Sequence, residues 1–153
     1  MKKLVVLFLP LVFLVGCTNE VEENKYAYLE YKNELEEQEN FSSEEDIDFN
    51  VYFNIIRENE EIVNYSIIID HPNINMYDVK ALLIHDYTYD EAFPSIGILD
   101  NPVDLLKDTN NKIELKGQIQ TINDISHVQF KLYLEYKDDN GIENKIYYQV
   151  SRG

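Results

Sequence analysis

The three histidines and Ser95 are the side chains of this chain that we consider first as catalytic candidates. His71, His85 and His127 lie in different segments, and none belongs to a His-x-His or His-Glu-x-x-His pattern that would hold a metal ion. Ser95 stands in Pro-Ser-Ile-Gly, which lacks the Gly-x-Ser-x-Gly turn of a serine nucleophile. These patterns predict no catalytic residue, no metal and no cofactor, so we expect a protein that is not an enzyme.

Carboxylates are abundant, with 29 acidic residues against 13 lysines and arginines. Because almost any two could be placed as acid and base, their number carries no catalytic signal. Asp100, Asp104 and Asp108 offer the hard oxygen ligands that calcium takes, but no stretch has the spacing of a calcium-binding loop. Solvated turn residues are the favoured interpretation. A metal-dependent envelope accessory or enzyme that uses His85, Asp86 and Asp90 remains the competing hypothesis.

The segment from His85 to Ile98 is the candidate binding loop, because it combines aromatic side chains, a stiff proline and a permissive glycine in a long irregular connection. The candidate residues are His85, Asp86, Tyr87, Tyr89, Asp90, Phe93, Pro94, Ser95 and Gly97. The alternative is architectural, with Phe93, Ile96 and Ile98 closing one end of the fold. Both roles are compatible with the sequence.

Outward tyrosines are a second candidate surface. Tyr52, Tyr133 and Tyr147 occupy outward positions of predicted strands and would form an aromatic patch for a glycan or a protein partner. Scattered surface tyrosines without a common role are the favoured interpretation.

The first seventeen residues indicate where such a site would operate. Lys2 and Lys3 precede an apolar run from Leu4 to Val15, which is too short for a stable transmembrane helix and is typical of an export signal. The run ends in Leu-Val-Gly-Cys, which resembles the bacterial lipobox. The resemblance implies a diacylglycerol thioether on Cys17 and cleavage after residue 16; a plain secretory signal with an accidental cysteine is the alternative. Together, two acyl chains anchor a protein stably.

Composition narrows the class of partner. The predicted leader carries two lysines and no acid, so its removal leaves 137 residues and changes the net charge from −16 to −18. Such a chain is repelled by nucleic acids and by anionic lipid headgroups. Cys17 is the only cysteine, so no disulfide can stabilise the exported domain. Stability must come from a packed core, which about 100 residues can supply.

Residues 17–48 are predicted to be an acidic tether. From Thr18 to Asp48 twelve acids face two lysines, and charge of one sign at this density extends a chain. Tyr28, Tyr31 and Leu35 share one helical face, which predicts a short helix that is marginal without a partner. The tyrosines would either dock a partner or rest on the surface of the domain itself.

Residues 49–153 are predicted to be one all-β domain. Apolar residues alternate with polar ones over 49–56, 63–69, 79–85, 113–121, 128–136 and 146–150, which predicts six strands. The third is expected to be central, because both of its faces are apolar, and a short strand is expected between 86 and 112. Asn140-Gly141 predicts a hairpin between the last two strands. Six or seven antiparallel strands fit an immunoglobulin-like or fibronectin-like β-sandwich, with a small β-barrel as the alternative.

Two stretches resemble one protein family. Ile84-His-Asp together with Phe93-Pro-Ser-Ile-Gly-Ile98, and Tyr28-Leu-Glu-Tyr-Lys-Asn-Glu-Leu35 upstream, are similar to a family of small, uncharacterised lipoproteins from low-GC Gram-positive bacteria. The similarity covers most of the mature chain. It implies a membrane-anchored setting and supplies no catalytic residue.

The sequence therefore predicts a lipoprotein on the extracytoplasmic face of the cell membrane, anchored through Cys17. We expect a non-enzymatic binding module whose partner is an envelope protein or a cell-wall ligand and not a nucleic acid. An inhibitor or immunity lipoprotein that protects its own cell is a third hypothesis.

Overall fold

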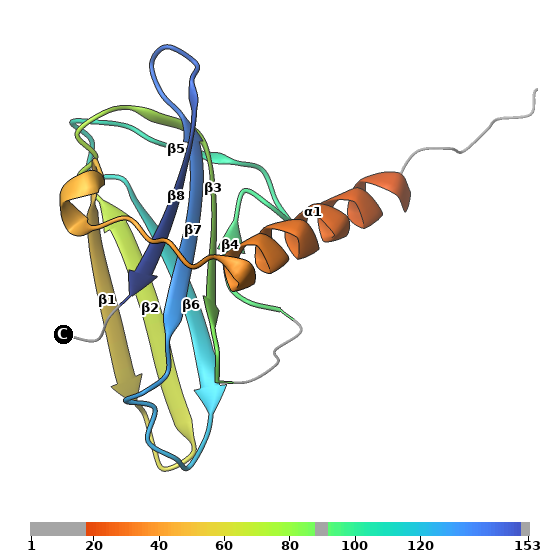
Figure 1. Ribbon diagram of the computed structural model, residues 1–153, viewed down its shortest axis with the longest axis vertical. Coiled ribbons are helices and arrows are strands. Elements are labelled where there is room, and N and C mark those ends of the chain that lie inside the picture. The colour runs from red at the N-terminus through yellow and green to blue at the C-terminus, as the bar shows by residue number, and fades with distance from the viewer. Residues whose placement is uncertain (1–17, 88–91, 151–153) are drawn as a thin grey trace, which may run out of the picture.

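The computed structural model of the 153-residue chain describes residues 18–87 and 92–150 (Figure 1). One long helix, α1 (Thr18–Glu37), is followed by a 3-10 turn, η1 (Glu44–Asp46), and then only by strands. The strands are β1 (Asn50–Arg57), β2 (Ile62–Asp70), β3 (Met76–His85), β4 (Ser95–Ile96), β5 (Val103–Leu105), β6 (Lys112–Gln120), β7 (Phe130–Lys137) and β8 (Glu143–Val150). They form two antiparallel sheets, so the body is an all-β sandwich and the small-barrel alternative is wrong.

The first sheet has the order β1-β2-β6. Strand β2 alternates strictly between buried and half-buried residues, as the sequence pattern predicts for a strand with one face in the core. The turn between β1 and β2 is held by Asn59, whose Oδ1 accepts the backbone N–H groups of Glu61 and Ile62. This local bond explains why a run of polar residues reverses the chain there.

The second sheet has the order β4-β3-β7-β8, and β5 also pairs with β3. The predicted central position of β3 is confirmed, as is the hairpin between β7 and β8. In that hairpin only Gly141 has a positive φ, 74°, and its N–H donates to the Asp138 carbonyl. The connection between β3 and β6 holds two short strands, β4 and β5, where the sequence predicted one.

The main core lies between the two sheets. It is formed by the inward residues of β2, β3, β6 and β7, with Leu105 of β5, Val150 of β8, and Phe49 and Ile125 from the connections. Aromatic rings fill its centre: Tyr65 lies 5.1 Å from Phe130, and Phe53 lies 4.7 Å from Phe130, between ring centroids. Gly117 faces Tyr65 across β2 and β6, and its missing side chain leaves room for the tyrosine ring.

Helix α1 differs from the short, marginal helix expected within a tether. It spans 20 residues and crosses the outer face of the second sheet (Figure 1). Tyr28 and Leu35 are buried against Leu82 and Tyr133, in a second apolar cluster outside the sandwich core. Two of the aromatic and aliphatic side chains predicted to share one face therefore rest on the domain itself, which stabilises a helix that would be weak in isolation.

A lysine of the second sheet also caps the C-terminal end of α1. No basic residue stands in the last turn of the helix, but the Lys131 ammonium of β7 donates to the carbonyl oxygens of Leu35, Glu36 and Gln38. A cation at this position satisfies carbonyls without partners in the helix and interacts favourably with the helix dipole. The acidic segment from Thr18 to Glu37 is thus joined to the sandwich by apolar and by polar contacts.

Candidate functional site

The described residues at the start of the predicted binding loop serve the fold. His85 ends β3, is buried, and packs edge to face against Tyr65 and Phe93. The Asp86 Oδ1 accepts the Gln129 N–H at 2.8 Å, and the Asp86 N–H donates to the Gln129 carbonyl. Asp86 therefore extends the pairing of β3 with the chain before β7, and His85 fills the end of the core.

Tyr87 reaches back to the loop that follows β6. Its hydroxyl forms a short hydrogen bond with the Thr121 hydroxyl, and the Asn123 amide donates to it at 3.5 Å. The hydrogen bonds with Thr121 and Asn123 lower the pKa of the Tyr87 hydroxyl below its usual value. Tyr89 and Asp90 lie outside the described residues.

The second half of the predicted loop is also structural. Phe93 is buried, and its N–H donates to the Tyr28 hydroxyl at 2.6 Å, which joins the loop to α1. The Pro94 carbonyl accepts the Leu83 N–H, and Ser95 pairs with β3 as part of β4. Gly97 has φ 72°, and a Cβ at this position would overlap the Val79 carbonyl oxygen. Apart from Gly97, these residues do not line the cleft described below, and the described geometry favours the architectural interpretation.

The outward tyrosines do not form one patch. Tyr133 is fully buried under α1, where its ring lies 4.9 Å from that of Tyr31. Tyr147 lies beside it and donates a short hydrogen bond to Glu34 of α1. Tyr52 is exposed, but it belongs to β1 of the other sheet. Helix α1, which the sequence analysis assigned to a tether, covers Tyr133 and Tyr147.

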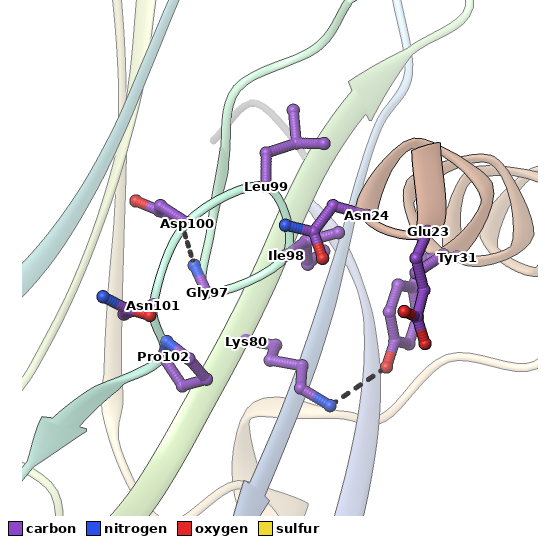
Figure 2. A pocket seen from close by; sticks show the side chains of 11 residues that line it. Glu23, Asn24, Tyr31, Lys80, Gly97, Ile98, Leu99, Asp100, Asn101 and Pro102 are labelled. Atoms are coloured by element: carbon purple, nitrogen blue, oxygen red, sulfur yellow. Dashed lines mark hydrogen bonds between the residues drawn. The ribbon is translucent and has the colours of Figure 1, made fainter. Parts of the chain in front are cut away.

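A cleft opens between α1 and the turn that precedes β5, with a volume of about 590 Å³ (Figure 2). The helix wall carries Glu23, Asn24, Ala27 and Tyr31, the floor is Lys80 of β3, and the opposite wall is the chain from 97 to 102. That wall is shaped by Asp100, whose Oδ1 accepts the Gly97 N–H at 2.6 Å. The cleft exists because α1 is docked, since the helix supplies one side of it.

Lys80 is the charged group at the floor of the cleft. Its ammonium donates to Glu135 Oε1 at 2.6 Å and to the Tyr31 hydroxyl at 3.2 Å. Burial alone would lower the pKa of Lys80, but the hydrogen bonds to Glu135 and Tyr31 outweigh it and raise the pKa above its usual value. This raised pKa favours the protonated, cationic form of Lys80.

Glu135 is the anion to which this cation is fixed. It stands opposite Lys80 on β3 and opposite Lys145 on β8, so a carboxylate lies between two lysines along one row of the sheet. The Tyr133 hydroxyl donates to Glu135 Oε2 at 2.6 Å. Burial would raise the pKa of the Glu135 carboxyl, but the hydrogen bonds from Lys80 and Tyr133 hold it below its usual value. Burial, followed by the hydrogen bond to Glu135, raises the pKa of Tyr133.

These pKa directions do not favour acid–base catalysis by this cluster. General acid–base catalysis near neutral pH needs a carboxyl whose pKa is raised or a lysine whose pKa is lowered. In Glu135 and Lys80 both shifts have the opposite sign. The cluster fixes charges in place, which suits the attachment of α1 and the recognition of a ligand at the cleft.

The aspartates considered for calcium do not converge. Asp100 binds the Gly97 N–H, Asp104 accepts the Asp78 N–H, and Asp108 occupies a turn with φ 61°. Across residues 18–87 and 92–150, no group of three or more histidine, cysteine, aspartate or glutamate side chains could hold a metal ion.

Sequence reasoning missed Lys80 and Glu135. The signal was a single charged residue inside each of two strongly apolar segments, Val79-Lys80-Ala81 and Leu134-Glu135-Tyr136. Such residues are seldom fully buried unless they are paired. Their pairing depends on the register of β3 and β7, which the sequence alone does not give.

Comparison of the chain with protein-family models, with curated proteins and with solved structures finds no match. Within the part of the chain that the structure describes, no helix has the length and apolar character needed to cross a membrane.

Proposed function

We propose that this protein is a lipoprotein anchored through Cys17 to the extracytoplasmic face of the cell membrane, after removal of residues 1–16. Its body acts as a non-enzymatic binding module, and its partner is an envelope protein or a cell-wall ligand. The site is the cleft between α1 and the chain from 97 to 102. The order of the strands, β1-β2-β6 against β3-β7-β8, corresponds to strands A-B-E and C-F-G of an immunoglobulin-like arrangement and supports that classification.

The observation that carries this proposal is the place of α1 in the chain. The helix starts at Thr18, directly after the candidate lipidated residue, and the same helix forms one wall of the cleft. The eleven residues from Thr18 to Tyr28 span about 16 Å as a helix. An anchor at Cys17 would thus hold the cleft at a short and defined distance from the membrane.

The charge of the chain supports a site that faces away from lipid. The mature net charge of −18 opposes contact with anionic headgroups, so the body remains in the aqueous layer of the envelope. Glu23, Asn24 and Asn101 are exposed at the rim of the cleft, and within the described residues their side chains make no hydrogen bond. These groups are available to a polar ligand.

The test uses photo-crosslinking in intact cells that produce the full chain. A photoreactive amino acid at Asn101, on the rim of the cleft, is compared with one at Ile142, which is exposed in the β7–β8 turn and does not line the cleft. We expect one discrete adduct from Asn101 that is absent from Ile142, and its loss when Tyr31→Ala disturbs the wall of the cleft.

Labelling with a palmitate analogue tests the anchor separately. Wild-type chain should take up the label and sediment with membranes, whereas Cys17→Ser should do neither. The same adduct pattern from both crosslinker positions would refute the cleft as the binding site, and an unlabelled wild-type chain would refute the lipid anchor.

A further inference from the structure

Strand β1 lies at one edge of the first sheet. Within the described residues it pairs only with β2, although it is eight residues long. The edge strand β8 of the other sheet is partly covered, because the Ser42 N–H donates to the Tyr147 carbonyl. Edge strands usually avoid pairing through prolines, lysines or bulges, yet β1 has no proline and no charged residue from Asn50 to Ile56.

The register of β1 on β2 fixes which backbone groups face outward. Asn54 lies opposite Ser66, and four residue pairs further on the Glu58 N–H donates to the Ile62 carbonyl at 2.9 Å. Hydrogen-bonded pairs alternate along an antiparallel ladder, so even-numbered residues of β1 bond to β2. The N–H and C=O groups of Val51, Phe53, Ile55 and Arg57 therefore point to the free edge.

The outward side chains of β1 have a symmetric arrangement: an apolar residue lies at equal distance on each side of a central asparagine. Tyr52 and Ile56 are exposed large apolar residues, 50% and 63% accessible, on the outer face of the sheet. Asn54 lies midway between them on the same face. Rotation by half a turn about Asn54 exchanges the positions of Tyr52 and Ile56.

We propose that two copies of this chain pair through their β1 strands, antiparallel and with the two-fold axis at Asn54. Phe53 and Ile55 of one copy then exchange backbone hydrogen bonds with Ile55 and Phe53 of the other. Asn54 faces its own counterpart as a non-hydrogen-bonded pair, in which side chains approach most closely. Tyr52 of each copy packs on Ile56 of the other, and the two three-stranded sheets become one.

Charge favours a second copy at this edge over most other surfaces. The chain carries a net charge of −16, so two copies repel each other wherever their acidic surfaces meet. The uncharged run from Phe49 to Ile56 allows close approach without direct repulsion. The other edge of the same sheet, β6, carries Lys112, Glu114 and Lys116, and is protected in the usual way. Association through β1 should strengthen as salt screens the remaining charge.

Disulfide formation tests the register. In the full chain carrying Cys17→Ser, a cysteine introduced at position 54 is the only thiol. At a two-fold axis its counterpart lies directly opposite, within the reach of a disulfide. We expect mild oxidation to link Asn54→Cys into dimers, while Tyr52→Cys and Ile56→Cys, each four residues from its own counterpart, remain largely monomeric. Equal linking at all three positions, or none at position 54, would overturn the proposal.

Sedimentation of the purified chain without introduced cysteines gives an independent readout. Ile56→Lys should weaken dimerisation by at least about tenfold, because it places a charge against Tyr52 of the other copy. The matched control is Ile122→Lys, at an exposed residue in the loop after β6, which should leave the dimer intact. A chain that is monomeric at every concentration, or a dimer insensitive to Ile56→Lys, contradicts pairing through β1.

Discussion

The two sheets of the sandwich differ in what lies on their outer faces. The outer face of β3-β7-β8 is covered by α1, and its side chains form a second core beside an ionic row, Lys80-Glu135-Lys145, in which only Glu135 is buried. The outer face of β1-β2-β6 carries no such cover within the described residues, and it presents Asn64, Ser66 and Gln118 to solvent. One face is a site of internal packing, and the other a surface.

The difference originates in the strands themselves. In β3 the residues on both faces are apolar or paired, and from Ala81 to His85 every residue is buried. In β2 only alternate residues are buried. A strand with two apolar faces, such as β3, needs a second layer over its outer face, which α1 supplies. A strand with one apolar face, such as β2, needs no such layer, because its other face can meet solvent. The helix also creates the cleft, so the candidate site belongs to the covered face.

The largest expected effect comes from removing an aliphatic side chain under the helix. Leu82 on β3 is fully buried, and Leu82→Ala should lower the free energy of unfolding by about 2–5 kcal/mol through the lost burial and the cavity left behind. The matched change is Ile68→Ala, at an outward position of the central strand β2, which should cost roughly 1 kcal/mol. Urea denaturation measures both. Equal losses would mean that α1 does not cover the second sheet.

The second prediction concerns the ionic row. Lys80→Met leaves the buried Glu135 carboxylate without its strongest partner and should cost about 1–3 kcal/mol at neutral pH. On the open face, Lys116→Met breaks a solvent-exposed pair with Glu114 and should change stability by less than about 0.5 kcal/mol.

The effect of Lys80→Met should depend on pH. The pKa of Glu135 in the folded chain lies below its ordinary value of 4.5, so its ionised form stabilises the fold above that pH. This contribution is lost as pH falls through the lowered pKa. The difference in unfolding free energy between wild type and Lys80→Met should therefore shrink in acid. A difference that stays constant would contradict the role of the ion pair.

Much of the sandwich was predictable because its strands follow a local rule. The alternation in 63–69 and the Asn140-Gly141 turn each depend on neighbouring residues, and both appear in the structure as expected. The docking of α1 was not predictable in the same way. The spacing of Tyr28, Tyr31 and Leu35 showed a helical face, but the face that receives it comes from strands about 50 to 100 residues further along the chain.

The candidate site shows the same limit. Aromatic residues, proline and glycine marked the segment 85–98 as a binding loop, but these residue types also close cores and form turns, which is what the described ones do. Lys80 and Glu135 are ordinary residues in the sequence. They form an ion pair only because the register of β3 and β7 places them opposite each other. Lys80 lines a cleft only because α1 packs on this sheet and supplies the other wall.

The smallest expected effect lies on the open face. Gln118 donates to Asn64 at 3.1 Å between exposed side chains, so Gln118→Ala should change the free energy of unfolding by less than about 0.5 kcal/mol, because water replaces the lost partner. Tyr133→Phe removes one hydrogen bond under the helix, to the buried Glu135, and should cost about 1–3 kcal/mol, because a buried carboxylate that loses a partner is poorly compensated by solvent. Measured by urea denaturation, this pair isolates the effect of the covering helix on a single hydrogen bond. A Tyr133→Phe variant as stable as Gln118→Ala would mean that water enters beneath α1.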